Sequence, residues 1–242
     1  MKILIPTAKE LNLQANTVPT KCLSETSQAV LDSLATYTKQ DLAELYGISF
    51  ERAEEEYQRI QALKQQKAEA YPALDLFDGL MYRNIKRQGL SPLEKDYLEQ
   101  HLLITSSLYG VIPAYSAISP HRLDFMMKVK VAGKSLKQHW KVMFDAAVEG
   151  EEVLLSLLSS EFETVFSKAV RKKMITFKFL EDRGGQLKIH STISKKARGQ
   201  FLTALLENQI DDLATIGQLS FAGFHFREDL SSEKEYVFAK KG

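Results

Sequence analysis

The chain has 242 residues, of which 44% are hydrophobic and 26% charged, a composition that is typical of a globular protein and excludes disordered or fibrous chains. Its 32 Lys and Arg residues balance 31 Asp and Glu residues, so a nucleic-acid site must be a local patch rather than a property of the whole molecule. No apolar run approaches the roughly 20 residues of a transmembrane helix, and residues 1–5 lack the features of a secretory signal. We therefore expect a cytoplasmic protein without a membrane partner. No linker divides the chain, which predicts a single domain over residues 1–242.

Short apolar runs predict strands, and apolar residues at helical spacing predict helices between them. The expected strands are 3–5, 102–104, 153–155, 175–180, 187–190 and 236–238. The expected helices are 42–45, 53–63, 136–147, 162–170 and 197–206. Ser91 and Glu94 have the spacing of a capping box, which predicts a further helix start. A hairpin turn is expected at 183–186, so the fold class is α+β, with a mixed sheet flanked by helices.

Residues 41–53 contain two helical segments joined at Gly47, Ile48 and Ser49, an arrangement that is similar to a helix-hairpin-helix. The amides of such a turn and the dipole of the second helix favour a phosphate oxygen, in a contact that ignores base sequence. Ser49 stands where the usual motif has a second Gly, and it can cap the second helix. An ordinary αα-hairpin also explains the pattern. Nearby acidic residues weaken the DNA interpretation because they repel phosphate; they are Asp41, Glu44, Glu51, Glu54, Glu55 and Glu56.

A second candidate phosphate site consists of Lys195, Lys196 and Arg198, which follow Ser194 at an expected helix start. A helix N-terminus together with several cations can bind an anion. Arg binds phosphate through two hydrogen bonds, and Lys adds a mobile positive charge. A solvated basic turn is the alternative.

Polar side chains that follow predicted strands form the third candidate, a pocket for a small anionic ligand. Ligands bind at the carboxyl ends of strands in open α/β sheets, and Lys195 is expected to join this pocket. Its other members are Lys9, Ser106, Tyr109, Arg122, Ser159 and Glu161. For Tyr109 the alternative is a packed aromatic ring, and for Arg122 it is a structural ion pair with Asp124 or Glu161.

Metal and cofactor motifs are lacking. The five histidines are scattered without a spacing that would place two ligands on one helix face. Gly133 to Ser135 resemble the end of a phosphate-binding loop, but Lys128 stands where that loop needs Gly. We expect no metal, no cofactor and no assigned catalytic residue. An enzyme stays an open alternative, because a buried Lys or Tyr with a lowered pKa could act as a general base.

Seven blocks in order along the chain resemble the YaaA-like peroxide-stress proteins. They are 3–9, Phe77-Asp-Gly79 with Tyr82, Ser106-Ser-Leu-Tyr-Gly110 with Arg122-Leu-Asp124, Ser159-x-Glu161-Phe162, 195–199, Phe221-x-Gly-Phe224 and Ser231-Ser-Glu233. The chain departs from the family pattern at Pro6-Thr7, where Ser-Pro is usual, and at His121, where Tyr is more common.

The resemblance implies an α+β fold of the YaaA type and a role in protection against oxidative stress by hydrogen peroxide. With the hairpin, it favours non-sequence-specific binding of double-stranded DNA, in a family linked to lower free intracellular iron. The alternative is an enzyme that acts on a nucleotide or another small anionic substrate in the strand-end pocket. A structural interaction protein is a third reading, and the sequence sets no oligomeric state.

Overall fold

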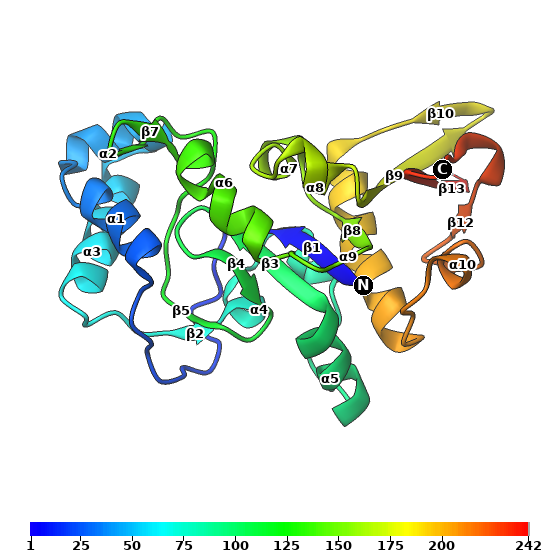
Figure 1. The fold of residues 1–242 in the computed structure, drawn as a ribbon, viewed down its shortest axis with the longest axis horizontal. Helices are drawn as coiled ribbons and strands as arrows, with labels where there is room; N and C mark the ends of the chain where they lie inside the picture. Colours follow the sequence, from blue (N-terminus) through cyan, green and yellow to red (C-terminus); the bar gives the residue numbers. More distant parts are fainter. Residues whose placement is uncertain (242) are drawn as a thin grey trace.

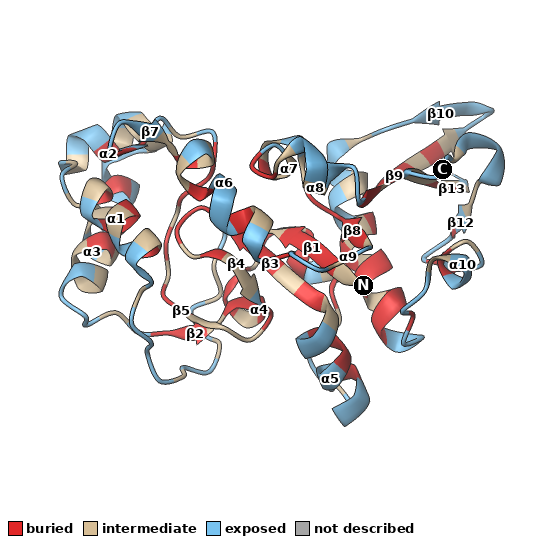
Figure 2. Ribbon diagram, viewed as in Figure 1, coloured by how far each residue is buried: buried red, intermediate tan, exposed pale blue. Residues whose placement is uncertain are grey.

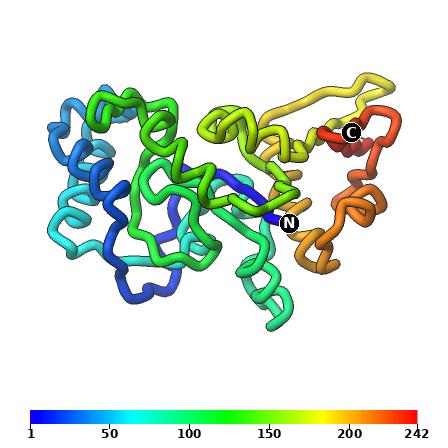
Figure 3. The backbone as a smooth tube through the Cα atoms, in the orientation of Figure 1, coloured from blue at the N-terminus to red at the C-terminus, as the bar shows by residue number. Residues whose placement is uncertain are grey.

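A nine-stranded mixed sheet forms the centre of the computed structural model, which describes residues 1–241 (Figure 1). Its middle five strands are parallel. In spatial order they are β13 (Glu235–Lys241), β9 (Met174–Arg183), β8 (Leu154–Ser156), β1 (Lys2–Pro6) and β3 (Leu102–Ser106). The N-terminal strand lies inside the sheet, where Ile3 is in register with Leu102 on one side and Leu155 on the other (Figure 3).

Antiparallel strands extend this parallel centre. They are β4 (Gly110–Pro113) beside β3, β10 (Gln186–Lys188) beside β9, and β12 (Phe224–Phe226) with β11 (Ser220–Phe221) beyond β13. Two small ribbons lie outside the main sheet. They pair β2 (Tyr71–Pro72) with β5 (Ala117–Ile118), and β6 (Lys130–Val131) with β7 (Lys134–Ser135).

Helices cover both faces of the sheet. The α-helices are α1 (Glu25–Leu34), α2 (Lys39–Tyr46), α3 (Phe50–Lys64), α4 (Ala73–Leu76), α5 (Pro92–His101), α6 (Leu136–Ala146), α7 (Ser160–Glu163), α8 (Lys168–Arg171), α9 (Ser191–Glu207) and α10 (Leu213–Ile216). Two 3₁₀ turns, η1 (Tyr82–Asn84) and η2 (Glu228–Leu230), complete the elements.

Two apolar cores result from the alternation of side chains along the strands. Ile3 and Ile5 of β1 point into a core with α5 and α9, whereas Leu4 points into a core with α1, α3 and α6. Figure 2 shows the central strands as buried and the outer sides of α2, α3 and β10 as exposed. An aromatic cluster that includes Phe177, Phe201 and Phe238 packs α9 onto the sheet, so the position of this helix is set by the core.

The predicted fold class is confirmed, as are the central strands, the hairpin turn at 183–186 and the capping box of α5. Ser91 Oγ accepts the Glu94 amide at 3.3 Å, and the Glu94 carboxylate accepts the Ser91 amide at 2.8 Å. The single helix predicted at 162–170 is wrong. Two short helices, α7 and α8, occur there because Ser167 caps a new helix through the Val170 amide, while its own amide donates to Asp145.

Candidate functional site

A hollow of about 600 Å³, here called the strand-end cleft, opens at the carboxyl ends of β1 and β8. Parallel strands end at the same edge of a sheet, so the segments that follow them meet there. The turn before η1 and one side of α9 close the cleft. Its lining residues are Pro6, Thr7, Ala8, Lys9, Glu10, Gly79, Leu80, Met81, Tyr82, Leu123, Asp124, Ser159, Glu161, Phe162, Thr192, Lys195 and Arg198.

Lys9 and Asp124 form an ion pair in the cleft, with Nζ and Oδ2 2.9 Å apart. The other carboxylate oxygen of Asp124 accepts the Met126 amide at 2.9 Å, which orients the side chain. Asp124 is buried, but 59% of the Lys9 side chain is exposed. The exposed part of the Lys9 side chain can contact a ligand anion, whereas a move away from Asp124 would leave a buried carboxylate without its cation.

Glu161 of α7 lies near this pair and accepts the Phe125 amide at 2.9 Å. Burial is the main cause that raises the pKa of Glu161, and the negative charge of Asp124 raises it further, while the Phe125 hydrogen bond and the charge of Lys9 lower it. Ser159, at the N-cap of α7, makes no side-chain capping bond. The cleft thus contains a carboxyl group that takes up a proton more readily than usual, which suits proton transfer.

One stripe of α9 faces the cleft. The stripe consists of residues three positions apart, which lie on the same side of a helix: Thr192, Lys195 and Arg198. Lys196 is exposed and does not line the cleft. The expected helix start at the lysines is wrong: α9 begins at Ser191 with His190 as its N-cap, so Lys195 and Lys196 lie in the second turn, beyond the helix-terminal amides.

The two cations of this stripe have no carboxylate within 4.0 Å in residues 1–241, unlike Lys9. Arg198 is half-buried, and this burial lowers the pKa of its guanidinium, an effect that the charge of Glu163 opposes. Glu163 itself accepts a hydrogen bond from Ser156 at 2.6 Å. An unpaired, partly desolvated guanidinium beside an exposed lysine is a strong site for a phosphate or carboxylate group.

Glycines allow the walls of the cleft to approach closely. A Cβ on Gly199 of α9 would lie 2.2 Å from the Met81 carbonyl oxygen, and a Cβ on Gly79 would lie 2.7 Å from the Ala8 Cβ. Tyr82 links the same walls, because its hydroxyl donates to the Pro6 carbonyl at 2.8 Å. The close approach of backbone segments therefore sets the shape of the cleft.

Three residues predicted for the pocket do not line the strand-end cleft; they are Ser106, Tyr109 and Arg122. Ser106 is buried beside His121, whose Nδ1 donates to the Ser119 carbonyl at 2.9 Å. Since burial lowers the pKa of His121 to about 4, the ring is neutral at pH 7 and its Nε2 accepts from Ser106 Oγ at 3.3 Å. The Tyr109 hydroxyl accepts the Ser119 amide at 2.9 Å. These residues hold the loop that carries Asp124, which is a structural role.

Arg122 points toward α3 rather than into the cleft. It lines a void of about 10 Å³ together with Tyr46, Glu56 and Arg59, which leaves no room for a ligand. Glu56 is paired with Arg59 one helical turn away. The Nε of Arg122 is buried without a hydrogen-bond partner among the described residues. Arg122 therefore packs the loop before Asp124 against the α2–α3 hairpin.

The α2–α3 hairpin forms as expected, but two of its three candidate amides are occupied. Gly47 adopts φ 59° as the C-cap of α2, and its N–H donates to the Glu44 carbonyl at 3.3 Å. The Ile48 N–H donates to the Ala43 carbonyl at 3.1 Å. Ser49 caps α3 by accepting the Arg52 amide at 3.5 Å. In Figure 1 this hairpin and α9 lie in different parts of the molecule.

Within residues 1–241, His, Cys, Asp and Glu side chains form no group of three that could hold a metal ion. In the same part of the chain, no helix combines the length and the apolar character that a membrane crossing needs.

The sequence-based prediction missed Thr192, the 79–82 turn and the pairing of Asp124 with Lys9. The sequence suggests Asp124 only as an ion-pair partner of Arg122. The signal that could have found it is its place in the Arg122-Leu-Asp124 block, since four of the other six blocks also contribute to the cleft. They supply Lys9, Gly79, Ser159, Glu161, Lys195 and Arg198. Blocks that are distant in the sequence thus converge at one site.

The mixed sheet and this strand-end cleft, which Lys195 and Arg198 of α9 enter, define an α+β protein with a candidate anion site. The sequence matches the family described as peroxide stress protein YaaA over residues 1–230. It is 63% identical over 241 residues to UPF0246 proteins of Streptococcus pneumoniae strains CGSP14 and D39, and 62% identical to that of strain 70585, in each case over 100% of both chains. The chain therefore belongs to the YaaA peroxide-stress protein family.

Proposed function

We propose that this protein acts in the peroxide-stress response by binding the phosphates of double-stranded DNA without sequence preference, and that it lowers free intracellular iron. Lys195, Lys196 and Arg198 on α9 are the proposed phosphate contacts. The observation that carries the proposal is the stripe of α9 on which Lys195 and Arg198 line the cleft with no carboxylate of residues 1–241 within 4.0 Å. Contacts of this kind position a protein on DNA and carry no sequence information.

The charge balance limits how strong such binding can be. With a formal net charge of +1, the molecule as a whole attracts DNA only weakly. Contacts by the α9 cations predict a salt dependence of binding that corresponds to about two or three phosphates. The hairpin has a secondary place in this proposal, because the Gly47 and Ile48 amides are occupied. Only the Ser49 amide and the start of α3 would add to the α9 contacts.

Fluorescence anisotropy of a labelled duplex across a salt series tests the DNA proposal. The triple variant Lys195→Ala, Lys196→Ala, Arg198→Ala should bind more weakly, with a shallower slope of log affinity against log salt. A matched control is Lys21→Ala, Lys64→Ala, Lys67→Ala, which removes the same charge from exposed positions outside the cleft. If both triple variants bind alike, the α9 cations have no special role.

A deletion strain tests the cellular part of the proposal. Peroxide damages DNA through reaction with ferrous iron, so loss of the protein should lower survival in peroxide and raise chelatable iron. Complementation with the α9 triple variant should fail if phosphate binding is the protective activity. Equal survival and equal chelatable iron in the deletion strain and its parent would contradict the stress role.

A second function, an enzyme acting on a nucleotide or another small anion, is favoured by the cleft itself. Its volume of about 600 Å³ suits a small ligand, and Glu161, whose pKa is raised, lines the same cleft as Lys195 and Arg198. A thermal-shift screen of nucleotides would show stabilisation of the wild type by its ligand. Glu161→Gln should keep ligand binding and abolish turnover, whereas Arg198→Ala should lose binding. Absence of any stabilising metabolite would count against this function.

A further inference from the structure

Lys195 and Arg198 lie about one helical turn apart on α9 and face the strand-end cleft, whereas Lys196 lies outside it. A phosphate bound by these cations can be of two kinds. A phosphodiester carries one negative charge and is joined to its chain on both sides. A phosphate monoester carries about 1.5 to 2 negative charges at pH 7 and is joined on one side only. The charge and the shape of the cleft discriminate between the two.

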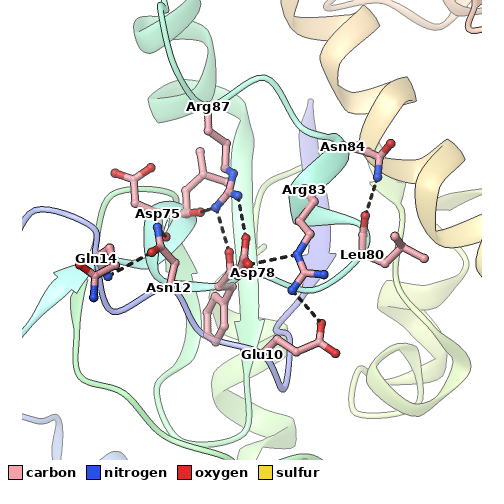
Figure 4. Close-up of polar contacts among 11 residues, drawn as sticks. Glu10, Asn12, Gln14, Asp75, Asp78, Leu80, Arg83, Asn84 and Arg87 are labelled. Carbon is pink, nitrogen blue, oxygen red and sulfur yellow. Dashed lines mark hydrogen bonds and ion pairs between the residues drawn. The ribbon is translucent and has the colours of Figure 1, made fainter.

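Several charged side chains of the cleft already have partners. Lys9 pairs with Asp124 at 2.9 Å. Figure 4 shows Glu10 and Arg83 directed toward each other, with their charged atoms 3.9 Å apart, and Arg83 does not line the cleft. These groups therefore contribute little charge to a ligand.

Lys195 and Arg198 have no carboxylate within 4.0 Å among residues 1–241. The remaining acid of the cleft is Glu161, which accepts the Phe125 amide at 2.9 Å. The pKa of Glu161 is raised, chiefly by burial, so this carboxyl group takes up a proton beside a second anion more readily than an ordinary one. Two unpaired cations then match the charge of a monoester and exceed that of a diester.

The shape of the cleft favours a phosphate that is joined on one side. Arg198 is half-buried, so a phosphate must enter the hollow of about 600 Å³ to contact it closely. The walls are held in place, because Asn84 donates to the Leu80 carbonyl at 2.8 Å (Figure 4) and Tyr82 donates to the Pro6 carbonyl at 2.8 Å. A phosphate within a duplex brings base-paired nucleotides on both sides, whereas a terminal phosphate brings only one neighbour into a hollow of nucleotide size.

Hydroxyl groups and apolar side chains complete the fit. Thr192 lies about one turn before Lys195 on the same stripe, and Ser159 makes no side-chain capping bond, so both hydroxyls can donate to a phosphate oxygen. A monoester has three terminal oxygens, which accept these donors together with the α9 cations. Apolar residues of the cleft can contact an attached sugar or base; they are Leu80, Met81, Leu123 and Phe162.

We propose that the strand-end cleft selects phosphate monoesters over phosphodiesters, and that Lys195 and Arg198 determine this specificity. Such a group has two sources, the phosphorylated end of a DNA strand and a free nucleotide. The first source rests on the proposed DNA function, and the second rests on the alternative function as an enzyme. At a DNA end, the exposed Lys196 contacts a backbone phosphate beside the terminal one.

Fluorescence anisotropy with three labelled DNAs of one shared sequence tests the strand-end source. The first has single-stranded overhangs that end in 5′-phosphates, and the second has the same overhangs with 5′-hydroxyls. The third is a dumbbell closed by loops, which has no ends. We expect the phosphorylated ends to bind about tenfold or more tightly than the other two, because charge-assisted hydrogen bonds to the terminal phosphate are added.

Isothermal titration calorimetry with AMP and 3′,5′-cyclic AMP tests the free-nucleotide source. The two compounds share base and sugar, but AMP is a monoester and cyclic AMP is a diester. We expect AMP to bind about tenfold or more tightly than cyclic AMP, for the same physical reason.

Four variants assign the specificity to individual residues. Lys195→Ala and Arg198→Ala should each reduce the preference for the monoester, and Lys195 is exposed, so its variant tests the proposal even if Arg198→Ala does not fold. Lys196→Ala should weaken the three DNAs by the same factor, because Lys196 lies outside the cleft. Lys67→Ala, at an exposed position outside the cleft, should leave every affinity unchanged.

The outcomes separate this specificity from the functions on which it rests. Equal binding of the three DNAs, together with equal binding of AMP and cyclic AMP, would overturn the specificity and leave DNA binding intact. Lack of binding by all three DNAs would refute the DNA function, while tighter binding of AMP than of cyclic AMP would still support the specificity. A preference that Lys195→Ala leaves unchanged, or lack of binding by every probe, would also overturn it.

Discussion

Replacing Gly199 with Ala should displace α9 and weaken the strand-end cleft, although Ala is the better helix former. The new Cβ would lie 2.2 Å from the Met81 carbonyl oxygen, 2.9 Å from the Asn84 Cβ and 3.0 Å from the Asn84 carbonyl carbon. Ordinary contact requires about 3.5 Å, so the helix or the η1 backbone must move by on the order of 1 Å. Arg198 is the neighbour of Gly199 and moves with it.

The cost of this overpacking exceeds the gain in helix propensity. Forcing an extra carbon into a well-packed contact costs about 1–3 kcal/mol, and a backbone contact belongs at the upper end because it cannot rotate away. Ala recovers up to about 1 kcal/mol in a helix interior. We expect a net loss of about 2 kcal/mol, which lowers the melting temperature by roughly 4–8 °C.

Denaturant and thermal unfolding of the Gly199→Ala variant measure this effect. The control is Gly217→Ala, because Gly217 has φ −65° and a Cβ there would lie 3.6 Å from its nearest neighbours, which is ordinary contact. The control should unfold within about 0.5 kcal/mol of the wild type. A Gly199→Ala variant as stable as the wild type or more so would refute the argument that close backbone approach shapes the cleft.

Three other changes have defined outcomes. The pKa of His121 is about 4 in the folded protein and 6.5 ordinarily, so the unfolded chain binds a proton first as the pH falls. About 3 kcal/mol of stability is therefore lost between pH 6.5 and 4. His121→Phe should flatten the dependence of the unfolding free energy on pH, measured by urea unfolding, and an unchanged dependence would contradict the assignment. Asp124→Asn removes a charge that raises the pKa of Glu161, so an NMR titration of the Glu161 carboxyl should show a lower pKa, and a rise would contradict that cause. Ser91→Ala should cost about 1 kcal/mol through loss of the α5 cap, measured by thermal unfolding against Ser160→Ala at an exposed position. No change in stability would show that the cap is dispensable.

Local signals determined much of the secondary structure. The central strands are short apolar runs whose alternation serves two cores, and the start of α5 follows from the local spacing of Ser91 and Glu94. The strand order is not local: β1 pairs with β3 and β8, and only the packing of distant segments selects those partners. The break between α7 and α8 depends on Asp145 of α6, which accepts the amide of Ser167, the N-cap of α8.

For the site, the sequence by itself determined that polar residues follow the strands and that cations cluster near the start of α9. Tertiary structure decided which of them meet. Three of the predicted residues line the cleft, namely Lys9, Ser159 and Glu161. Ser106 instead contacts His121, and Arg122 packs against α3. The direction of a side chain after a strand depends on the turn that follows. Lys195 and Arg198 lie in the cleft and Lys196 lies outside it because of where α9 starts and how Gly199 packs against η1. The rotation and packing of a helix depend on contacts with distant residues, which a local sequence pattern does not contain.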